Sequence, residues 1–450
     1  MIAPARKAAY DLLRHIELDS AHSDDMLGSE TVSCLEVRDR NLVTEITYGT
    51  LRWQGWLDYV LRRAISRSWD TVDPEVRILL RLSLYQMSCM DRIPDHASIN
   101  DAVELAKHSL KPGAARFVNG VLRKLGRQRP WVAPEFHRDC PMWARASMPR
   151  WLWERWEARF GTDRAYEYAL SLNRPPRAAF RWCERREQTP PCQPVDPKTM
   201  SDGVKGSRFS FSIPGTLRSE LVPGAYLVEE GKPLHTNSDR RIQDEASQLI
   251  PHLFGTVDGA RVWDACAAPG GKSAILLERC GPSGWVISSD RDPNRARRML
   301  DKLSSCGGAR SDVLIADAEF PFPFRIRFDA VLADVPCSGL GTLRRNPEIK
   351  WRLQEEQLLE LGLRERRLLN AVAGAVRTGG MLLYSTCSTE PEENELVVEE
   401  FLHSHLEFRL QKPSFPSGID DRLDLKGMFR SFPSSRLWDG FFAALMVRTA

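Results

Sequence analysis

The strongest constraint on the fold of this 450-residue chain is a regular alternation of short apolar strands and helices over residues 239–450. Strand patterns occur at 260–266, 284–290, 312–317, 328–334 and 380–386, with helical patterns at 270–280, 294–305 and 358–372. A parallel strand pair needs a crossover connection, which is usually a helix. The segment therefore predicts a mainly parallel, doubly wound α/β sheet, with ligands outside the carboxyl ends of its strands.

The first 140 residues follow a helical period instead. Apolar side chains recur on one face in the first segment (Ala8, Leu12 and Ile16) and again over 117–125. Several short helices with short connections indicate a small all-α domain at 1–140. Residues 141–238 contain a proline turn at 173–176, a strand pattern at 177–182 and a Pro/Gln-rich surface loop at 188–197. We expect a small α+β linker domain there, and a third domain at 239–450.

Composition excludes several classes of protein. Hydrophobic residues make up 42% of the chain and charged residues 27%, as in ordinary globular proteins. No apolar run approaches the roughly 20 residues of a membrane helix, and Asp11, Arg14 and His15 interrupt the N-terminus where a signal peptide would be apolar. The ten cysteines include no C-x-x-C pair, so no metal site is expected. We expect a cytoplasmic protein that does not bind membranes and is a monomer by default.

A glycine-containing turn follows the first strand of the alternating region. Residues 264–273 read DACAAPGGKS, and such a turn exposes backbone N–H groups at the positive end of a helix. A phosphate-binding P-loop would need glycine where Cys266 stands, and the dinucleotide fingerprint G-x-G-x-x-G is absent. The turn is therefore suited to an anionic group of another kind of ligand.

Aspartates end the following strand patterns. Asp290 comes nineteen residues after Gly271, where a carboxylate can accept hydrogen bonds from ribose hydroxyls. Asp317 ends the third pattern and supplies a polar group for an adenine. A glycine turn for a carboxylate and an acid for a ribose suit S-adenosylmethionine. A di- or triphosphate would need more positive charge.

Two thiols stand after the fourth and fifth strand patterns. Cys337 lies in DVPCSG and Cys387 in STCS. Carbon 5 of cytosine is a weak nucleophile, and a thiolate that adds to carbon 6 makes carbon 5 nucleophilic enough to accept a methyl group. Asp334 is placed to hold the ring nitrogen 3 side and to stabilise that adduct. Residue chemistry does not choose between the two thiols.

Basic residues cluster in two places although the net charge is only +3. Residues 107–129 contain seven lysines and arginines and no acid, and a second cluster spans 344–352. Clustered cations can bind backbone phosphates or can simply form a solvated face, and sequence spacing does not separate the two. The candidate RNA contacts are Lys107, Lys111, Arg116, Arg123, Lys124, Arg344, Arg345 and Lys350.

Several of these segments together resemble one family. CAAPGGKS (266–273), VISSDRDPNR (286–295), LADVPCSGLGTLRRNPEIKW (332–351), YSTCSTEPEEN (384–394) and DGFF (439–442) are similar to motifs of the RsmB (Sun/Fmu) group of RNA 5-methylcytosine methyltransferases. Residues 39–53, 92–107 and 117–125 resemble the NusB-like RNA-binding domain of that group, and 171–181 and 242–249 resemble its linking region. The resemblance covers nearly the whole chain. It implies a NusB-like helical domain, a linker and a Rossmann-like class I methyltransferase domain.

The resemblance also implies roles for individual residues. Cys387 would be the nucleophile, and Cys337 would assist product release. The residues implied in cofactor binding are Cys266, Ala267, Ala268, Pro269, Gly270, Gly271, Lys272, Asp290, Asp317 and Asp334. The implied substrate is a cytosine of 16S ribosomal RNA before full assembly of the small subunit. One departure from the motif is Val335, where the family usually has alanine.

Two alternatives remain open. The same chemistry can act on tRNA or on another site of ribosomal RNA. A non-catalytic RNA-binding factor of the antitermination type would also use the helical domain. That second alternative predicts a degenerate catalytic site, whereas Lys272, Asp334, Cys337 and Cys387 are all present.

Overall fold

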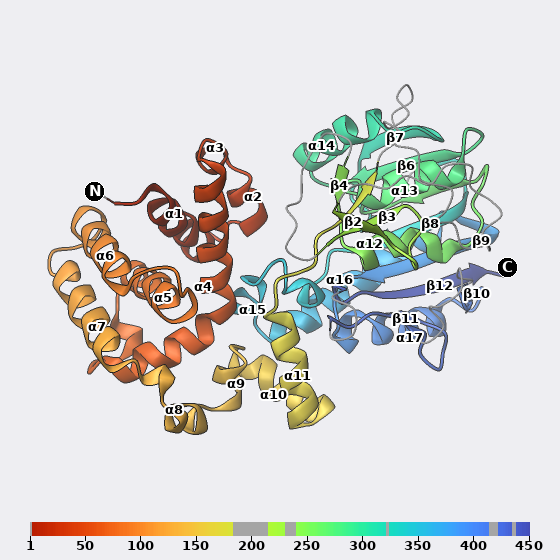
Figure 1. The fold of residues 1–450 in the computed structure, drawn as a ribbon. Helices are drawn as coiled ribbons and strands as arrows, with labels where there is room; N and C mark the ends of the chain where they lie inside the picture. Colours follow the sequence, from red (N-terminus) through yellow and green to blue (C-terminus); the bar gives the residue numbers. More distant parts are fainter. Residues whose placement is uncertain (1, 183–214, 230–239, 321–323, 414–421, 434–437) are drawn as a thin grey trace, which may run out of the picture. The chain divides into compact units, whose positions relative to one another are not determined.

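The computed structural model describes residues 2–182, 215–229, 240–320, 324–413, 422–433 and 438–450 (Figure 1). The chain forms two compact units. Unit 1 comprises Met1–Pro175 and Leu343–Glu355, and unit 2 comprises Pro176–Thr342 and Glu356–Ala450. The Pro/Gln-rich stretch at 188–197 lies outside the described residues. None of the described helices is both long and apolar enough to cross a membrane.

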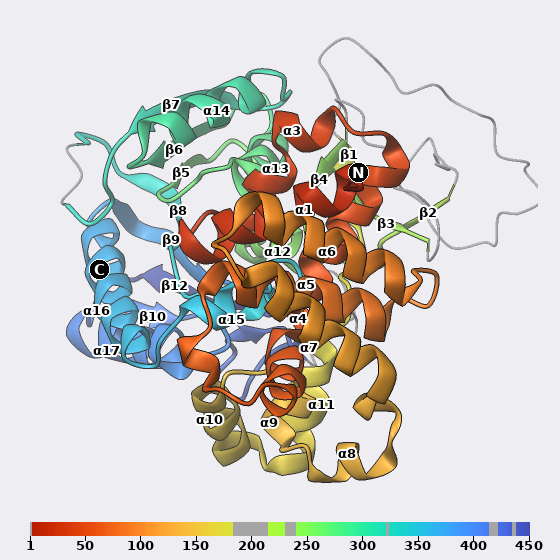
Figure 2. The same cartoon turned by 90° about the vertical axis from the view of Figure 1, so that its left-hand side faces the viewer.

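Unit 1 is helical, as predicted for residues 1–140. Its long helices are α1 (Pro4–Leu18), α4 (Val37–Ala64), α5 (Pro74–Cys89), α6 (Asp95–Ser109) and α7 (Ala114–Gln128), which appear in orange and red in Figure 2. Shorter helices are α2 (Ser23–Leu27), α3 (Glu30–Ser33), α8 (Pro134–Asp139), α9 (Met142–Arg145), α10 (Arg150–Phe160), α11 (Thr162–Leu172) and α15 (Ile349–Arg352). The predicted apolar stripes face one core, because Leu12, Ile16, Val118 and Leu122 are all buried in it.

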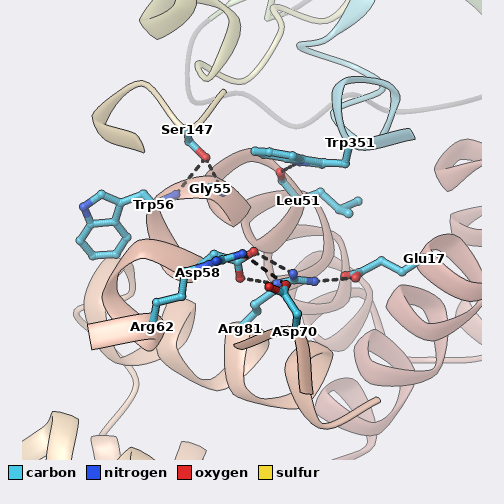
Figure 3. Close-up of polar contacts among 10 residues, drawn as sticks. All are labelled: Glu17, Leu51, Gly55, Trp56, Asp58, Arg62, Asp70, Arg81, Ser147 and Trp351. Carbon is cyan, nitrogen blue, oxygen red and sulfur yellow. Dashed lines mark hydrogen bonds and ion pairs between the residues drawn. The ribbon is translucent and has the colours of Figure 1, made fainter. Parts of the chain in front are cut away.

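A buried ion-pair network joins three helices of unit 1. Arg81 of α5 donates to both carboxylate oxygens of Asp58 on α4, at 2.6 and 2.8 Å, and to Glu17 of α1 at 2.6 Å (Figure 3). The Arg81 side chain is only 7% exposed, and an unpaired charge at that depth would be strongly destabilising. The two carboxylates therefore allow a cation inside the helical core.

Unit 2 begins with a small antiparallel sheet in the order β2-β3-β1-β4. Its strands are β1 (Ala179–Trp182), β2 (Thr216–Arg218), β3 (Ala225–Val228) and β4 (Arg240–Ile242). The predicted strand at 177–182 is confirmed as β1. The helices α10 and α11 of the predicted linker belong to unit 1 and its strands to unit 2. A separate linker domain at 141–238, and with it the three-domain division, stays a prediction.

The large sheet of unit 2 has the order β10-β12-β9-β8-β5-β6-β7, with β11 paired to β12. Its strands are β5 (Arg261–Asp264), β6 (Trp285–Asp290), β7 (Arg310–Ile315), β8 (Phe328–Asp334), β9 (Val376–Thr386), β10 (Phe408–Leu410), β11 (Phe429–Arg430) and β12 (Phe442–Arg448). Strands β5 to β9 pair in parallel, and β12 and β10 add antiparallel strands at one side. The mainly parallel, Rossmann-like sheet predicted from the sequence is confirmed.

Two apolar cores cover the two faces of this sheet. Successive strand residues alternate between them, since Val262 and Ala330 enter the first core and Trp263 and Val331 enter the second. The first core contains side chains of α12 (Glu245–Leu249), α13 (Gly271–Cys280) and α14 (Pro293–Ser304). The second contains those of α16 (Glu356–Ala373) and α17 (Glu395–Ser404). The alternation is what a sheet with helices on both faces requires.

Candidate active site

The order of the strands determines where a ligand can bind. Strands β5, β6 and β7 follow one another in one direction from the centre of the sheet, and β8 and β9 lie in the other direction. The strand order therefore reverses between β5 and β8. In open α/β sheets, ligands bind beyond the carboxyl ends of the strands at such a reversal. Asp264 ends β5 and Asp334 ends β8, so both lie at this point.

The turn after β5 has the backbone conformation that its glycines allow. Gly270 has φ +92°, and a Cβ atom there would lie 3.0 Å from the Cγ atom of Met299. That conformation and that contact favour glycine. Helix α13 starts at the next residue, so its first N–H groups have no partner within the helix and can bind an anion.

Asp264 is a buried acid beneath this turn. It is fully buried, and its Oδ2 atom accepts a hydrogen bond from the Ser273 hydroxyl at 2.6 Å. Its other oxygen, Oδ1, is buried and has no hydrogen-bond partner among the residues that the structure describes. Burial raises the pKa of Asp264 to about 7, although the bond from Ser273 acts in the opposite direction. The unused oxygen is a polar atom for which a bound group can supply the partner.

Lys272 connects the turn after β5 to the end of β8. Its Nζ atom lies 2.7 Å from Oδ2 of Asp334 and 5.2 Å from the centre of the Phe441 ring. Burial by itself lowers the pKa of a lysine, but the adjacent Asp334 carboxylate outweighs it and the pKa of Lys272 is raised. Lys272 is therefore charged at neutral pH and orients the Asp334 carboxylate.

The structure places the other two predicted aspartates near the ends of neighbouring strands. Asp290 ends β6 and is 5% exposed, and it accepts a hydrogen bond from the Asp292 N–H at 3.0 Å. Asp317 lies two residues beyond β7, which ends at Ile315 rather than at 317 as predicted. Its Oδ1 atom accepts a hydrogen bond from the Glu319 N–H at 3.0 Å. Both carboxylates are held by a local turn in the chain.

The two predicted thiols meet at the ends of neighbouring strands. The sulfur atoms of Cys337 and Cys387 are 3.2 Å apart, and the Cys387 N–H lies 3.3 Å from the Cys337 sulfur. The reason is the register of the sheet, in which Asp334 of β8 pairs with Ser385 of β9. The thiol-to-thiol contact and burial raise the pKa of Cys337 well above its usual range. Cys337 therefore keeps its proton at neutral pH.

Two glycines hold the backbone of this region together. The Gly341 N–H donates to the Cys387 carbonyl at 2.9 Å, and the Gly440 N–H donates to the Gly341 carbonyl at 2.7 Å. A Cβ atom on Gly341 would lie 2.0 Å from the carbonyl oxygen of Gly440. Only glycine permits this close approach. Backbone hydrogen bonds therefore connect three segments: DGFF, the loop that follows Cys337, and the backbone at Cys387.

Three buried polar side chains behind the thiols were not predicted from the sequence. Glu365, Tyr384 and Glu393 are fully buried beside the Cys337 and Cys387 loops. The available signal was the acidic run at 390–393, directly after the second thiol motif. An acidic run of this kind predicts a solvent-exposed loop, whereas Glu393 is buried in the structure.

The first predicted basic cluster is mainly exposed. Of its candidate RNA contacts, four are exposed on α6, on α7 and between them: Lys107, Lys111, Arg116 and Arg123. Lys111 is 86% exposed and lies 3.0 Å from the Asp73 carboxylate. Lys124 differs, because its Nζ atom donates to the Ala64 carbonyl at the end of α4, at 2.9 Å. The Lys124 side chain thus caps the C-terminal end of α4 within unit 1.

The second predicted basic cluster is not a surface. Lys350 is 1% exposed, and its Nζ atom bonds the carbonyls of Arg52 and Ser147 at 2.9 and 2.8 Å. A third bond joins it to Oδ1 of Asn173 at 2.9 Å. The prediction that Lys350 contacts RNA is therefore wrong. Its amine satisfies three oxygens inside unit 1 and is not accessible to a phosphate.

Arg344 has a similar position. It is 1% exposed, and its Nε atom donates to the Ser171 carbonyl at 2.9 Å. The predicted RNA contact is wrong for Arg344 as well, because the guanidinium is enclosed. Arg345 is half-buried, and its contact with RNA stays a prediction. The whole segment Leu343–Glu355 packs in unit 1, where Trp351 donates from Nε1 to the Leu51 carbonyl at 2.6 Å (Figure 3).

A Rossmann-like sheet with a glycine turn after its first strand and acids beyond the next strands defines the class of S-adenosylmethionine-dependent methyltransferases. Comparisons with known proteins agree with this class. Residues 252–447 match the family model described as 16S rRNA methyltransferase RsmB/F, and residues 3–127 match the NusB family.

Similar proteins extend over the full chain. "Probable ribosomal RNA small subunit methyltransferase B" of Bacillus subtilis is 32% identical over 98% of both chains. Ribosomal RNA small subunit methyltransferase B of Pseudomonas syringae is 32% identical over 82% of this chain and 80% of its own. The crystal structure of PH0851 covers 100% of this chain and 99% of its own, with 26% identity and a TM-score of 0.77. The chain belongs to the 16S rRNA methyltransferase RsmB/F family, which confirms the resemblance seen in the sequence.

Proposed function

We propose that this protein transfers a methyl group from S-adenosylmethionine to carbon 5 of a cytosine in 16S ribosomal RNA. The observation that carries the proposal is the pair of sulfur atoms 3.2 Å apart at the ends of β8 and β9, next to the Lys272–Asp334 ion pair. Methyl transfer to an oxygen or an exocyclic nitrogen needs no thiol. A thiol at this place is accounted for by a covalent adduct at carbon 6 of the base.

The cofactor is proposed to bind between the turn and the strand ends. The turn Cys266–Lys272 would surround its amino-acid part, and Asp334 would lie near its amino group. Asp290 would bind the ribose, and Asp317 would bind the adenine. The N-terminal N–H groups of α13 and the unpartnered Oδ1 of Asp264 fit a ligand with both a carboxylate and a polar amino group. S-adenosylmethionine supplies a methyl group on a positively charged sulfur. The acids at this site favour such a ligand over a phosphate.

Cys387 is the proposed nucleophile. As a thiolate, its sulfur would add to carbon 6 of the cytosine, and the π electrons of the C5=C6 double bond would then form the bond from carbon 5 to the methyl group, with S-adenosylhomocysteine as the leaving group. Loss of the carbon 5 proton would return an electron pair to the C5=C6 double bond as the sulfur leaves with the electrons of the C6–S bond. Asp334, which contacts Lys272, is proposed to hold the ring nitrogen 3 side of the base by a hydrogen bond and so to stabilise the adduct.

Cys337 is proposed to assist product release. Its raised pKa keeps it in the thiol form, which is a poor nucleophile and whose S–H can donate a hydrogen bond to a leaving sulfur. At 3.2 Å it is within reach of the departing Cys387 sulfur. The two thiols would then divide attack and release between them.

Two variants test this division of roles. Cys337→Ala incubated with unmodified small-subunit RNA and S-adenosylmethionine should accumulate a protein–RNA adduct that survives denaturing electrophoresis. Cys387→Ala should form none. An adduct with Cys387→Ala and none with Cys337→Ala would reverse the roles, and no adduct with either would contradict the covalent mechanism.

The RNA substrate is proposed to be the small-subunit ribosomal RNA before full assembly, bound by a monomer through the exposed basic residues of α6 and α7. Bisulfite mapping of RNA from a deletion strain tests this. One cytosine of 16S RNA should lose its methyl group. A loss confined to tRNA or to the large subunit would support the alternative substrates, and no loss in any RNA would support a non-catalytic role.

A further inference from the structure

A buried polar network lies behind the two thiols, and the proposed chemistry does not use it. Its members Glu365, Tyr384, Glu393 and Asn394 are all completely buried. Burying a carboxylate is costly unless hydrogen bonds compensate for the lost water. Two such carboxyl groups, on α16 and in the loop before α17, therefore need compensating contacts.

Glu393 makes its contacts to the residues that directly follow the thiols. Its Oε1 atom accepts the Ser338 N–H at 2.6 Å, and its Oε2 atom accepts the hydroxyls of Ser338, at 2.6 Å, and of Ser388. Ser338 follows Cys337, and Ser388 follows Cys387. One carboxylate thus joins the loop after β8 to the loop after β9.

The next residue, Asn394, supports the second loop from both sides of its thiol. Its Oδ1 atom accepts a hydrogen bond from the Thr386 hydroxyl at 2.6 Å, and its Nδ2 atom donates to the Ser388 carbonyl at 3.1 Å. Thr386 and Ser388 flank Cys387 in the chain. The backbone around Cys387 is therefore attached to the same short loop that carries Glu393.

The second carboxyl group reduces the buried charge. Burial and the neighbouring Glu393 raise the pKa of Glu365 to about 10, so Glu365 is protonated at neutral pH. The Tyr384 hydroxyl faces both residues, at 2.5 Å from the Glu393 carbonyl oxygen and 3.3 Å from Oε2 of Glu365. Burial raises the pKa of Glu393 as well, and the hydrogen bonds from Ser338 and Ser388 act in the opposite direction.

We propose that Glu393 is a positioning residue that sets the spacing between the Cys337 and Cys387 sulfur atoms. Its catalytic consequence rests on the proposed cytosine chemistry, whereas the spacing itself can be measured without RNA. If one sulfur attacks the base and the other assists release, both must reach the same ring, and small displacements then cost rate. Loss of Glu393 should lower kcat and leave the KM for RNA nearly unchanged.

Thiol oxidation measures the spacing directly in the full-length protein without RNA. Diamide takes up two protons and two electrons while a disulfide forms between Cys337 and Cys387, and mass spectrometry of alkylated peptides follows its rate. Glu393→Ala should slow this step at least tenfold, and Glu393→Gln, which keeps one carbonyl acceptor, should lie between Ala and wild type. The double variant Ser338→Ala/Ser388→Ala removes the two hydroxyl bonds from the other side and keeps the bond from the Ser338 N–H, so it should also slow the step but by less than Glu393→Ala.

Glu399→Gln is the matched control, because Glu399 lies on α17 and pairs with Lys426 at the surface. It should oxidise at the wild-type rate. Unchanged S-adenosylmethionine affinity and a cooperative thermal transition show that each variant is folded. A wild-type oxidation rate in Glu393→Ala and in the double serine variant would overturn the proposal.

Methylation kinetics then test the consequence. A tenfold or larger fall in kcat, with KM changed less than threefold, is expected for Glu393→Gln. Slowed oxidation together with an unchanged kcat would contradict the catalytic role of the spacing. If the wild-type protein methylates no cytosine, the proposed function fails, while the oxidation rates still decide whether Glu393 sets the spacing.

Discussion

The two basic clusters of this chain look alike in sequence and differ completely in the folded protein. Lys111 in the first is 86% exposed on a connection between helices, whereas Lys350 in the second is 1% exposed with three oxygen partners. Both clusters contain candidate RNA contacts in the sequence, where spacing does not distinguish RNA binding from a solvated face. The difference shows that a cluster of basic residues indicates nucleic-acid binding only when those side chains are not used as hydrogen-bond donors to buried carbonyl groups of the protein itself.

Unmet hydrogen-bond acceptors explain the second cluster. The segment Leu343–Glu355 meets carbonyl groups of unit 1 at several places, including those of Leu51, Arg52 and Ser147. Buried carbonyls that lack a partner are destabilising, and long basic side chains can satisfy several of them. Here the lysine and arginine side chains donate hydrogen bonds inside unit 1, so substitutions in this segment test the comparison first.

The largest effect is expected for Lys350→Met. The substitution keeps the length of the side chain but leaves three buried oxygens without a donor, so unit 1 should lose about 3 kcal/mol of unfolding free energy. Urea unfolding followed by circular dichroism measures the loss. Lys107→Met, at an exposed position of α6, should change the free energy by less than about 0.5 kcal/mol. Equal effects in both variants would erase the contrast between the clusters.

The next effect concerns RNA affinity. Replacing Lys107, Lys111, Arg116 and Arg123 together by Gln should weaken binding to small-subunit RNA by about ten- to a hundredfold. The slope of log K against log salt should fall by up to roughly 3, because each neutralised phosphate contributes about 0.7 to 0.9. Fluorescence anisotropy at salt concentrations from about 50 to about 200 mM measures both the affinity and the slope. An unchanged slope would mean that this face is only solvated.

A pH effect should separate the two clusters further. Burial lowers the pKa of Lys350 well below its usual range, whereas in the unfolded chain it titrates near 10.4. Between these pKa values the unfolded chain binds the additional proton, so stability should rise as the pH rises toward 10, by at most about 1.4 kcal/mol per unit. Unfolding curves at several pH values should show this rise in wild type and in Lys111→Met, and not in Lys350→Met. A parallel profile for Lys350→Met would contradict it.

The smallest effect is expected for Trp351→Phe. The variant keeps an aromatic ring against unit 1 and loses only the bond from Nε1 to the Leu51 carbonyl (Figure 3). One buried hydrogen bond contributes about 1 kcal/mol, so the melting temperature should fall by a few degrees. Differential scanning calorimetry can resolve a shift of that size. No shift would mean that water replaces the lost donor.

Much of the candidate site was predictable because local patterns carry it. Periods of two and 3.6 residues identify the strands and helices, and parallel connectivity then requires Asp264, Asp290 and Asp334 to lie at one edge of the sheet. The same connectivity predicts that Cys337 and Cys387, which follow the fourth and fifth strand patterns, lie at this edge as well. Their register across β8 and β9 then placed the sulfurs 3.2 Å apart.

Other features were not predictable from local patterns. Glu393 belongs to a run that reads as a polar loop, and its role depends on Ser338, fifty-five residues away. Gly341 is needed because Gly440 approaches it, and these residues are far apart in the chain. Contacts of this kind depend on which loops the strand order brings side by side. No local sequence pattern predicts that order.

The sequence by itself determined the helical first region, the Rossmann-like sheet, the family and the positions of the acids and thiols at strand ends. Those follow from periodicity and connectivity, which act over short stretches of chain. Only the tertiary structure decided that Arg344 and Lys350 are internal donors and that Glu393 binds both thiol loops. The burial of a basic side chain and its hydrogen-bond partners depend on packing between distant segments. A lysine in the same kind of local sequence can therefore face solvent or lie among buried oxygen atoms.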